Sequence, residues 1–228
     1  MDGVTAASET PRGAVSCLKR DGDRSVWLVE RSGVPARTVK RWPLTPALAF
    51  KLAVGRSQPQ RQARATRMLR RLGLAVPEVL AGPRVVRGAG PGRFVELELA
   101  FVPGQTMLDR LRAGDADSRA ARRLGAACGE LIASLAAHGL LNRDLKLSNL
   151  IVDEHERVWM IDPVGVRRCV DRSTAVFRML ERLGVEPASI PCVVPRSAVI
   201  AAVRRAWRSL PRRPAQAAHR LRSTRPPH

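Results

Sequence analysis

Four polar side chains stand at spacings that could serve one reaction: Asp144, Lys146, Asn149 and Asp162. Transfer of a phosphoryl group from ATP needs a carboxylate that orients and deprotonates the acceptor hydroxyl. It also needs oxygen ligands for magnesium, and positive charge where the γ-phosphate becomes electron-rich. Two aspartates, a lysine and an asparagine supply these groups. The spacing therefore predicts phosphoryl transfer with ATP and Mg²⁺.

The segments around these residues favour the same interpretation. Residues 118–138 have the apolar spacing of a long amphipathic helix, which would end directly before the loop that holds Asp144. Short strands are expected at 150–152 and 158–161, so that Asp162 would follow the second strand. A polar surface turn is the alternative for the loop, but the residue types, their spacing and the flanking strands agree with a catalytic role.

The rest of the chain predicts a β-rich first half and a helical second half. A helix capped by Ser57 is expected to run to about Leu72, and residues 102–105 interrupt the strand pattern. Further helices are expected from Met107 and at 172–184 and 196–210. Strands are expected at 15–18, 26–29, 37–42, 84–87 and 94–101.

This order predicts an α+β fold with two lobes, a small β-rich N-lobe and a shortened helical C-lobe. The expected divisions are a disordered leader (1–13), the N-lobe (14–102), the C-lobe (103–210) and an Arg- and Pro-rich tail (211–228).

The loop resembles a known family. Residues 141–153, LNRDLKLSNLIVD, followed by Asp162, resemble the protein-kinase catalytic loop H-R-D-x-x-x-x-N and the metal-binding aspartate after it. Among kinase-like families the chain is most similar to the small bacterial lipopolysaccharide (Kdo/heptose) kinases, in the lead-in HGLLNRDLK, the strand end VKRWP and the short C-terminal lobe. The resemblance covers about residues 15–185, and its specific motifs lie within 138–162. It implies a two-lobed protein-kinase-like fold.

The resemblance also implies roles for individual residues. Asp144 would be the catalytic base, and Lys146 would neutralise the γ-phosphate. Asn149 and Asp162 would bind magnesium. Lys40, on the third strand, would hold the α- and β-phosphates of ATP, and Lys51 would compete for that role if the strand register were different.

Two departures from the family pattern favour a weaker activity. The turn 20–24, expected to cover the nucleotide, has a single glycine, Gly22, so its backbone amides would reach the phosphates only in part. No Asp or Glu occurs from Arg31 to Pro77, where the family offers a glutamate to the strand lysine. Gln60 or Gln62 could donate a hydrogen bond there but could not pair a charge.

These observations leave several functions open. We expect an ATP- and Mg²⁺-dependent kinase that phosphorylates a hydroxyl of a lipopolysaccharide-type sugar or another small or lipid-linked acceptor. A catalytically weak, pseudokinase-like nucleotide-binding module is one alternative, and a compact atypical protein kinase is another. A nucleic-acid-binding protein ranks last, because the chain has no Tyr and only four Phe for base stacking.

Composition suggests where the protein acts. The formal net charge of +20 comes mainly from arginine and favours phosphate-rich partners. The basic helix at 57–72 and the Arg-rich tail could approach an anionic lipid surface. Because no apolar run is long enough for a membrane span and the N-terminus does not resemble a secretory signal, we expect a cytoplasmic protein, in part peripheral to the inner face of the membrane.

Overall fold

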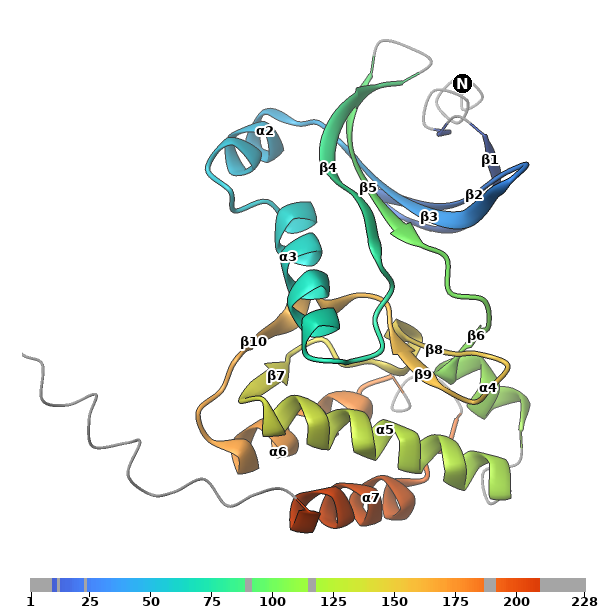
Figure 1. The fold of residues 1–228 in the computed structure, drawn as a ribbon, viewed down its shortest axis with the longest axis vertical. Coiled ribbons are helices and arrows are strands. Elements are labelled where there is room, and N and C mark those ends of the chain that lie inside the picture. Colours follow the sequence, from blue (N-terminus) through green and yellow to red (C-terminus); the bar gives the residue numbers. More distant parts are fainter. Residues whose placement is uncertain are drawn as a thin grey trace, which may run out of the picture.

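The fold is seen in a computed structural model, which describes residues 10–11, 13–22, 24–88, 92–114, 118–186 and 192–209. It is an α+β arrangement with a β-rich N-terminal part and a helical C-terminal part (Figure 1). The leader predicted for 1–13 lies mostly outside the described residues, and the tail predicted for 211–228 lies wholly outside them.

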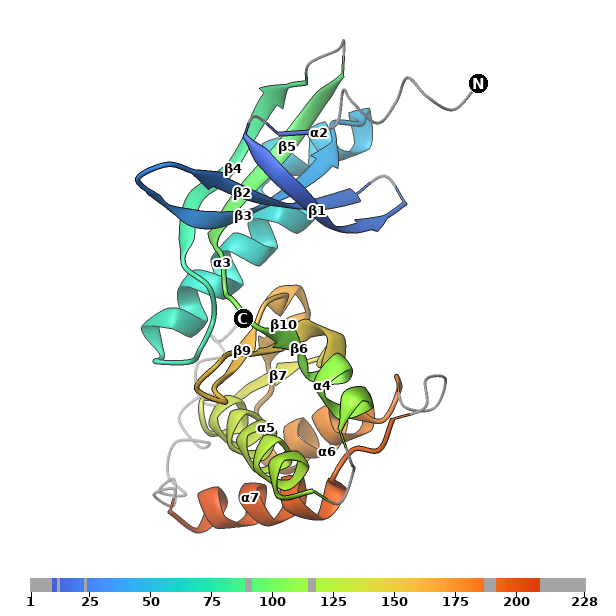
Figure 2. The ribbon, with the colours of Figure 1, turned by 90° about the vertical axis from the view of Figure 1, so that its right-hand side faces the viewer.

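The N-terminal part is built on one curved antiparallel sheet with the strand order β1-β2-β3-β5-β4 (Figures 1 and 2). The predicted strands are present, and β4 begins earlier than expected. The strands are Ala14–Asp21 (β1), Arg24–Arg31 (β2), Val34–Pro43 (β3), Val79–Arg87 (β4) and Arg93–Ala100 (β5).

Strand register determines which way Lys40 points. Lys40 lies opposite Val26 of β2 and Leu97 of β5, in the central strand of the sheet. Because side chains alternate along a strand, Lys40 shares its face with Trp42, which packs with Leu97 in the core beneath the sheet. Lys40 therefore points toward the rest of the molecule.

Two helices follow β3: α2 (Pro46–Ala53), which the sequence analysis did not predict, and α3 (Gln58–Arg71). Ser57 caps α3 as predicted and forms a capping box with Gln60, an arrangement worth about 1 kcal/mol. Helix α3 joins two cores, since its Ala63 packs beneath the sheet and its Leu69 packs into the C-terminal core. It lies between the sheet and the C-terminal part (Figure 2).

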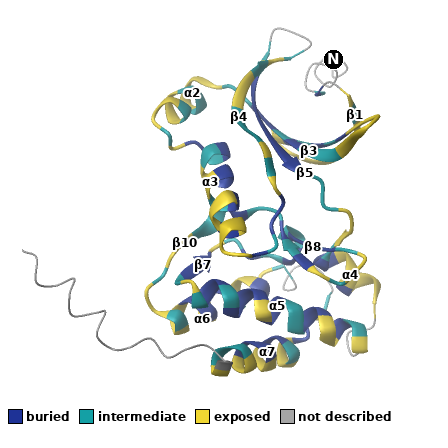
Figure 3. Ribbon diagram, in the orientation of Figure 1, coloured by how far each residue is buried: buried dark blue, intermediate teal, exposed yellow. Residues whose placement is uncertain are grey.

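The C-terminal part is formed around the predicted long helix. This helix packs against the last described helix, and glycines at the contact allow close approach: a Cβ on Gly129 would lie 2.4 Å from the backbone oxygen of Val199. Buried positions line the facing sides of these helices (Figure 3). The helices are Met107–Ala113 (α4), Arg119–Ala137 (α5), Arg172–Leu183 (α6) and Arg196–Ser209 (α7).

Short strands hold the loops of the C-terminal part. They form a three-stranded sheet, β6-β8-β9, and a two-stranded pair, β7-β10. Their bounds, with two 3₁₀ turns, are Gln105–Thr106 (β6), Leu140–Asn142 (β7), Leu147–Asn149 (η1), Leu150–Val152 (β8), Val158–Met160 (β9), Pro163–Gly165 (η2) and Val166–Arg168 (β10). Within the described part of the chain, no helix is both long and apolar enough to cross a membrane.

Candidate functional site

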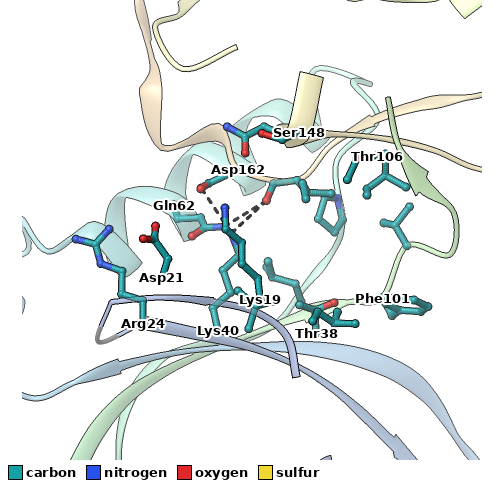
Figure 4. Close-up of a pocket in the computed structure, with 18 of the residues that line it drawn as sticks. Lys19, Asp21, Arg24, Thr38, Lys40, Gln62, Phe101, Thr106, Ser148 and Asp162 are labelled. Atoms are coloured by element: carbon teal, nitrogen blue, oxygen red, sulfur yellow. Dashed lines mark hydrogen bonds and ion pairs between the residues drawn. The ribbon is translucent and has the colours of Figure 1, made fainter. Parts of the chain in front are cut away.

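A cavity of about 470 Å³ opens between the curved sheet and the C-terminal part (Figure 4). Strands β1, β2 and β3 form one wall, and the segment 148–151 with Ile161 and Asp162 forms the opposite wall. The connection from β5 to α4, where residues 102–105 were expected to interrupt the strand pattern, also lines the space, with residues 99–102 and 104–106. Three of the predicted site residues, Lys40, Asn149 and Asp162, therefore line one cavity.

Lys40 and Asp162 meet inside this cavity. The Lys40 Nζ lies 3.6 Å from Oδ1 of Asp162 and 3.5 Å from the backbone oxygen of Ile161, to which it donates (Figure 4). The Lys40 side chain is 12% exposed and that of Asp162 is 28% exposed. Burial lowers the pKa of Lys40, and the attraction of Asp162 only partly offsets this effect. The competing candidate Lys51 is exposed on α2 and does not line the cavity.

Gln62 occupies the position on α3 that faces Lys40. It is buried, and its Nε2 donates to the backbone oxygen of Ile161 at 3.4 Å, the same acceptor that Lys40 uses. The Gln60 side chain does not face Lys40, because it forms other hydrogen bonds: its Oε1 accepts from the Ser57 N–H in the cap of α3, and its Nε2 donates to the Leu52 backbone oxygen. Gln62 thus holds the carbonyl beside Asp162, and Asp162 supplies the negative charge that α3 lacks.

Asp162 and Asn149 offer oxygen atoms suited to a hard cation. Oδ1 of Asp162 is buried and accepts no hydrogen bond from the described residues. Asn149 Nδ2 donates to the backbone oxygen of Asp144 at 3.0 Å, so its side-chain oxygen is the group left for a cation. Among the described residues no three His, Cys, Asp or Glu side chains cluster as a metal site. These donors nevertheless fit Mg²⁺, which usually takes one or two protein ligands together with phosphates and water.

Asp144 and Lys146 lie just outside the residues that line the cavity. Their charged groups are 3.4 Å apart, and each side chain is more than one-third exposed. The Asn149 bond to the Asp144 backbone links this pair to the cavity wall. An exposed carboxylate at the rim can meet an acceptor hydroxyl that arrives from solvent.

Asn142 stands where the catalytic-loop motif that the sequence resembles has a histidine, and it supports the loop that holds Asp144. It is fully buried, its Oδ1 accepts from the Asp144 backbone N–H at 3.0 Å, and its Nδ2 contacts the Met160 sulfur at 3.0 Å. Gly165 packs closely against both residues: a Cβ at this position would lie 2.6 Å from Asn142 Oδ1 and 2.8 Å from the Asp144 nitrogen. The position of Asp144 therefore depends on two neighbours that carry no charge.

Ser148 and Glu186 are site residues that the sequence analysis missed. Ser148 lines the cavity next to Asn149, and both its backbone N–H and its hydroxyl donate to the Glu186 carboxylate. Glu186 lies just beyond the end of α6, and the two residues are 38 positions apart. No local motif joins positions so distant, so the sequence alone gave no signal for this contact.

Gly22 does not line the cavity, unlike the other predicted cofactor-binding residue, Lys40. It has φ +55° at the turn between β1 and β2, and a Cβ added there would meet no atom within 4 Å. Its role in the structure is the tight turn. Asp23, which belongs to the predicted turn 20–24, lies outside the described residues.

The chain was compared with models of known protein families and with curated protein sequences, and neither comparison found a match.

Proposed function

We propose that the chain is an ATP- and Mg²⁺-dependent phosphotransferase with a two-lobed protein-kinase-like fold, which transfers the γ-phosphate to a hydroxyl. The observation that carries the proposal is the pairing of Lys40 with Asp162 in a cavity that Asn149 also lines. A five-stranded sheet above a helical part, with the cavity between them, is the arrangement that the resemblance leads us to expect.

In the proposed reaction, the acceptor hydroxyl oxygen attacks the γ-phosphorus of ATP. The bond between that phosphorus and the β,γ-bridging oxygen breaks, ADP leaves, and the hydroxyl proton passes to the Asp144 carboxylate. Lys40 binds the α- and β-phosphates, and the Lys146 ammonium lies beside Asp144, where the transferred group would carry charge. The described chain thus offers a base and two cations for the reaction.

Magnesium would be held by Asp162 and the side-chain oxygen of Asn149, and it would neutralise charge on the β- and γ-phosphates. The buried Oδ1 of Asp162, which accepts no hydrogen bond from the described residues, supports this assignment. With a cation there, Lys40 would exchange its carboxylate partner for phosphate oxygens.

The acceptor that we propose is a sugar hydroxyl of a lipopolysaccharide-type or other lipid-linked molecule. This proposal rests on the resemblance in residues 138–162 and in the VKRWP strand end. A peripheral position at an anionic membrane surface would suit such a substrate, because the chain carries a net charge of +20.

A catalytically weak nucleotide-binding module is the second candidate, and Gln62 favours it. The neutral amide faces the Lys40 region where a glutamate would pair the lysine, so Lys40 is held by Asp162 alone among the described carboxylates. A lysine that loses this partner to a bound cation is less firmly positioned, and a loss of positioning lowers the rate of transfer.

The two candidates are separated by measuring binding and transfer on the same proteins. ATP binding is measured by calorimetry with Mg²⁺, and ADP release is measured in the presence of a panel of sugar and lipid-linked hydroxyl compounds. The kinase proposal predicts acceptor-dependent ADP release that falls by about 10²-fold or more in Asp144→Asn, with ATP affinity unchanged. Binding without release for any acceptor would support the module, and absence of ATP binding would overturn both.

A further inference from the structure

The hairpin formed by β1 and β2 presents side chains, and no glycine, to the cavity. Gly22 lies at its turn, away from the lining. The hairpin residues that line the cavity are Leu18, Lys19, Asp21, Arg24, Ser25 and Val26. Two of these six residues, Lys19 and Arg24, are cationic, and both lie close to the turn at Gly22.

A phosphate can be bound by backbone amides or by cationic side chains. Backbone amides need a bare chain, because a Cβ keeps the backbone away from the ligand. Lysine and arginine reach phosphate oxygens from a distance, and a guanidinium does so with two parallel hydrogen bonds. Because the hairpin lines the cavity with side chains and no glycine, it cannot bind phosphate through bare backbone amides. Its composition favours binding by cationic side chains.

Strand register places Lys19 close to Lys40. Lys19 lies opposite Val26, and Val26 lies opposite Lys40, so the three residues form one row across β1, β2 and β3. Neighbouring strands are about 4.8 Å apart, which separates the two lysine backbones by roughly 10 Å. Figure 4 shows both lysines projecting from the sheet face that lines the cavity. The charge of Lys19 is close enough to contribute to lowering the pKa of Lys40.

Arg24 extends the row of cations toward the turn. It lies two positions before Val26 on β2 and therefore shares the face of Val26. Its cross-strand neighbour is Asp21, which also lines the cavity and reduces the local positive charge. Figure 4 shows Arg24 and Asp21 on the same side of the cavity, beyond Lys40.

We infer that Lys19 and Arg24, together with Lys40, form a side-chain binding site for the polyphosphate of a nucleotide, which replaces the backbone amides of a glycine-rich turn. The inference rests on the proposed function for the identity of the ligand. Neither Lys19 nor Arg24 has a role in the catalytic-loop motif that the sequence resembles.

The affinity of such a site is expected to rise with the negative charge of the ligand. Each added phosphate gives the cations another acceptor, and salt weakens the exposed contacts by screening. Adenosine, which has no phosphate, gains nothing from Lys19 or Arg24. Comparison of adenosine with ATP therefore isolates the contribution of the phosphates, and variants of Lys19 and Arg24 show how much of it these two residues supply.

The test is a calorimetric titration of adenosine, AMP, ADP and ATP in EDTA, with the full chain and three variants. Lys19→Gln and Arg24→Gln each remove one cation from the cavity. Arg20→Gln is the matched control, because Arg20 lies between Lys19 and Asp21 on β1 but does not line the cavity. Circular dichroism melts of each protein without ligand check that the fold is retained.

We expect affinity to rise along the series from adenosine to ATP in the wild-type chain. Lys19→Gln and Arg24→Gln each weaken ATP binding about tenfold, the size of one charged hydrogen bond, and leave adenosine binding unchanged. Arg20→Gln changes neither the affinity for ATP nor the affinity for adenosine by more than about twofold. Equal affinity for adenosine and ATP, or an equal effect of all three variants, would overturn this inference alone. Absence of binding by adenosine and by all three nucleotides, both in EDTA and with Mg²⁺, would overturn the proposed function as well.

Discussion

The Lys40 ammonium and the Asp162 carboxylate lie 3.6 Å apart, although their residues belong to opposite walls of the cavity. Lys40 is supplied by the central strand of the sheet, and Asp162 follows β9 in the C-terminal part. The pair is a contact between opposite charges that links the two parts. Burial nevertheless outweighs the attraction, since the pKa of Lys40 is lowered. The charged form of Lys40 is therefore disfavoured in the folded protein, at a cost to stability.

The first prediction concerns this cost. Because the folded protein binds the Lys40 proton less readily than the unfolded chain does, stability rises with pH between the lowered pKa and 10.5. We expect Lys40→Met to melt at a higher temperature than wild type at pH 7, and the difference to shrink as the pH approaches 10.5.

Melting curves from pH 7 to 10 check this expectation. Lys51→Met is the control, because Lys51 is exposed and its replacement should shift the melting temperature little at any pH in this range. A Lys40→Met protein that is less stable at pH 7, or whose advantage does not depend on pH, would show that the ion pair outweighs burial.

The second prediction concerns the support of Asp144. In Gly165→Ala the new methyl group would collide with Asn142 Oδ1 and the Asp144 nitrogen, at 2.6 and 2.8 Å. We expect a loss of about 1–3 kcal/mol in unfolding free energy, and a larger fractional loss of phosphoryl transfer than of ATP binding. Gly184→Ala is the control, since Gly184 has φ −83° and its nearest contact is a flexible Arg196 side chain at 3.3 Å.

For Gly165→Ala, urea denaturation measures the unfolding free energy, calorimetry measures ATP affinity, and acceptor-dependent ADP release measures phosphoryl transfer. If transfer and ATP affinity fall together, or if the Gly184→Ala control behaves in the same way, the proposed positioning of Asp144 by Gly165 is wrong.

The third prediction assigns a positioning role to Glu186. Its carboxylate accepts from both the N–H and the hydroxyl of Ser148, beside Asn149. Glu186→Gln should weaken the Mg²⁺-dependent part of ATP binding by about tenfold and leave Mg²⁺-free binding unchanged, because Asn149 but not Lys40 loses support.

Glu181→Gln serves as the control, since Glu181 is an exposed residue of α6 that pairs with Arg178. Thermal shift with ATP, in the presence and absence of Mg²⁺, reports both quantities. A purely structural role for Glu186 would lower the two affinities equally, and that outcome would contradict the assignment.

Much of the fold could be predicted from the sequence because its signals are local. Helix α3 has a serine cap and a glycine after its end, and the alternation in 37–42 identified β3 and placed Lys40 on it. Helix α2 was missed because its apolar residues form no buried stripe: none of them is buried, and Leu48 packs against the core beneath the sheet only partly buried. Its cap, Thr45, follows Pro43 so closely that the segment looks like a loop.

The candidate site was predictable only in part. Asp144, Asn149 and Asp162 belong to one compact motif, whereas Glu186 meets Ser148 over 38 positions. Gly22 was expected at the phosphates because glycine suits close approach, but the strand register turns its neighbours, and not Gly22, toward the cavity. Side-chain direction in a hairpin with two register shifts depends on its partner strand, which no local pattern specifies.

In the proposed function, Asp162 and Asn149 complete a magnesium-nucleotide site opposite Lys40. Calorimetric titration of ATP with and without Mg²⁺, into wild type and Asp162→Asn, tests it most directly. We expect Mg²⁺ to strengthen ATP binding to wild type by about tenfold or more and to give no gain in Asp162→Asn, which retains the shape of the side chain without its charge. An equal Mg²⁺ effect in the two proteins, or no ATP binding to wild type at millimolar concentrations, would contradict it.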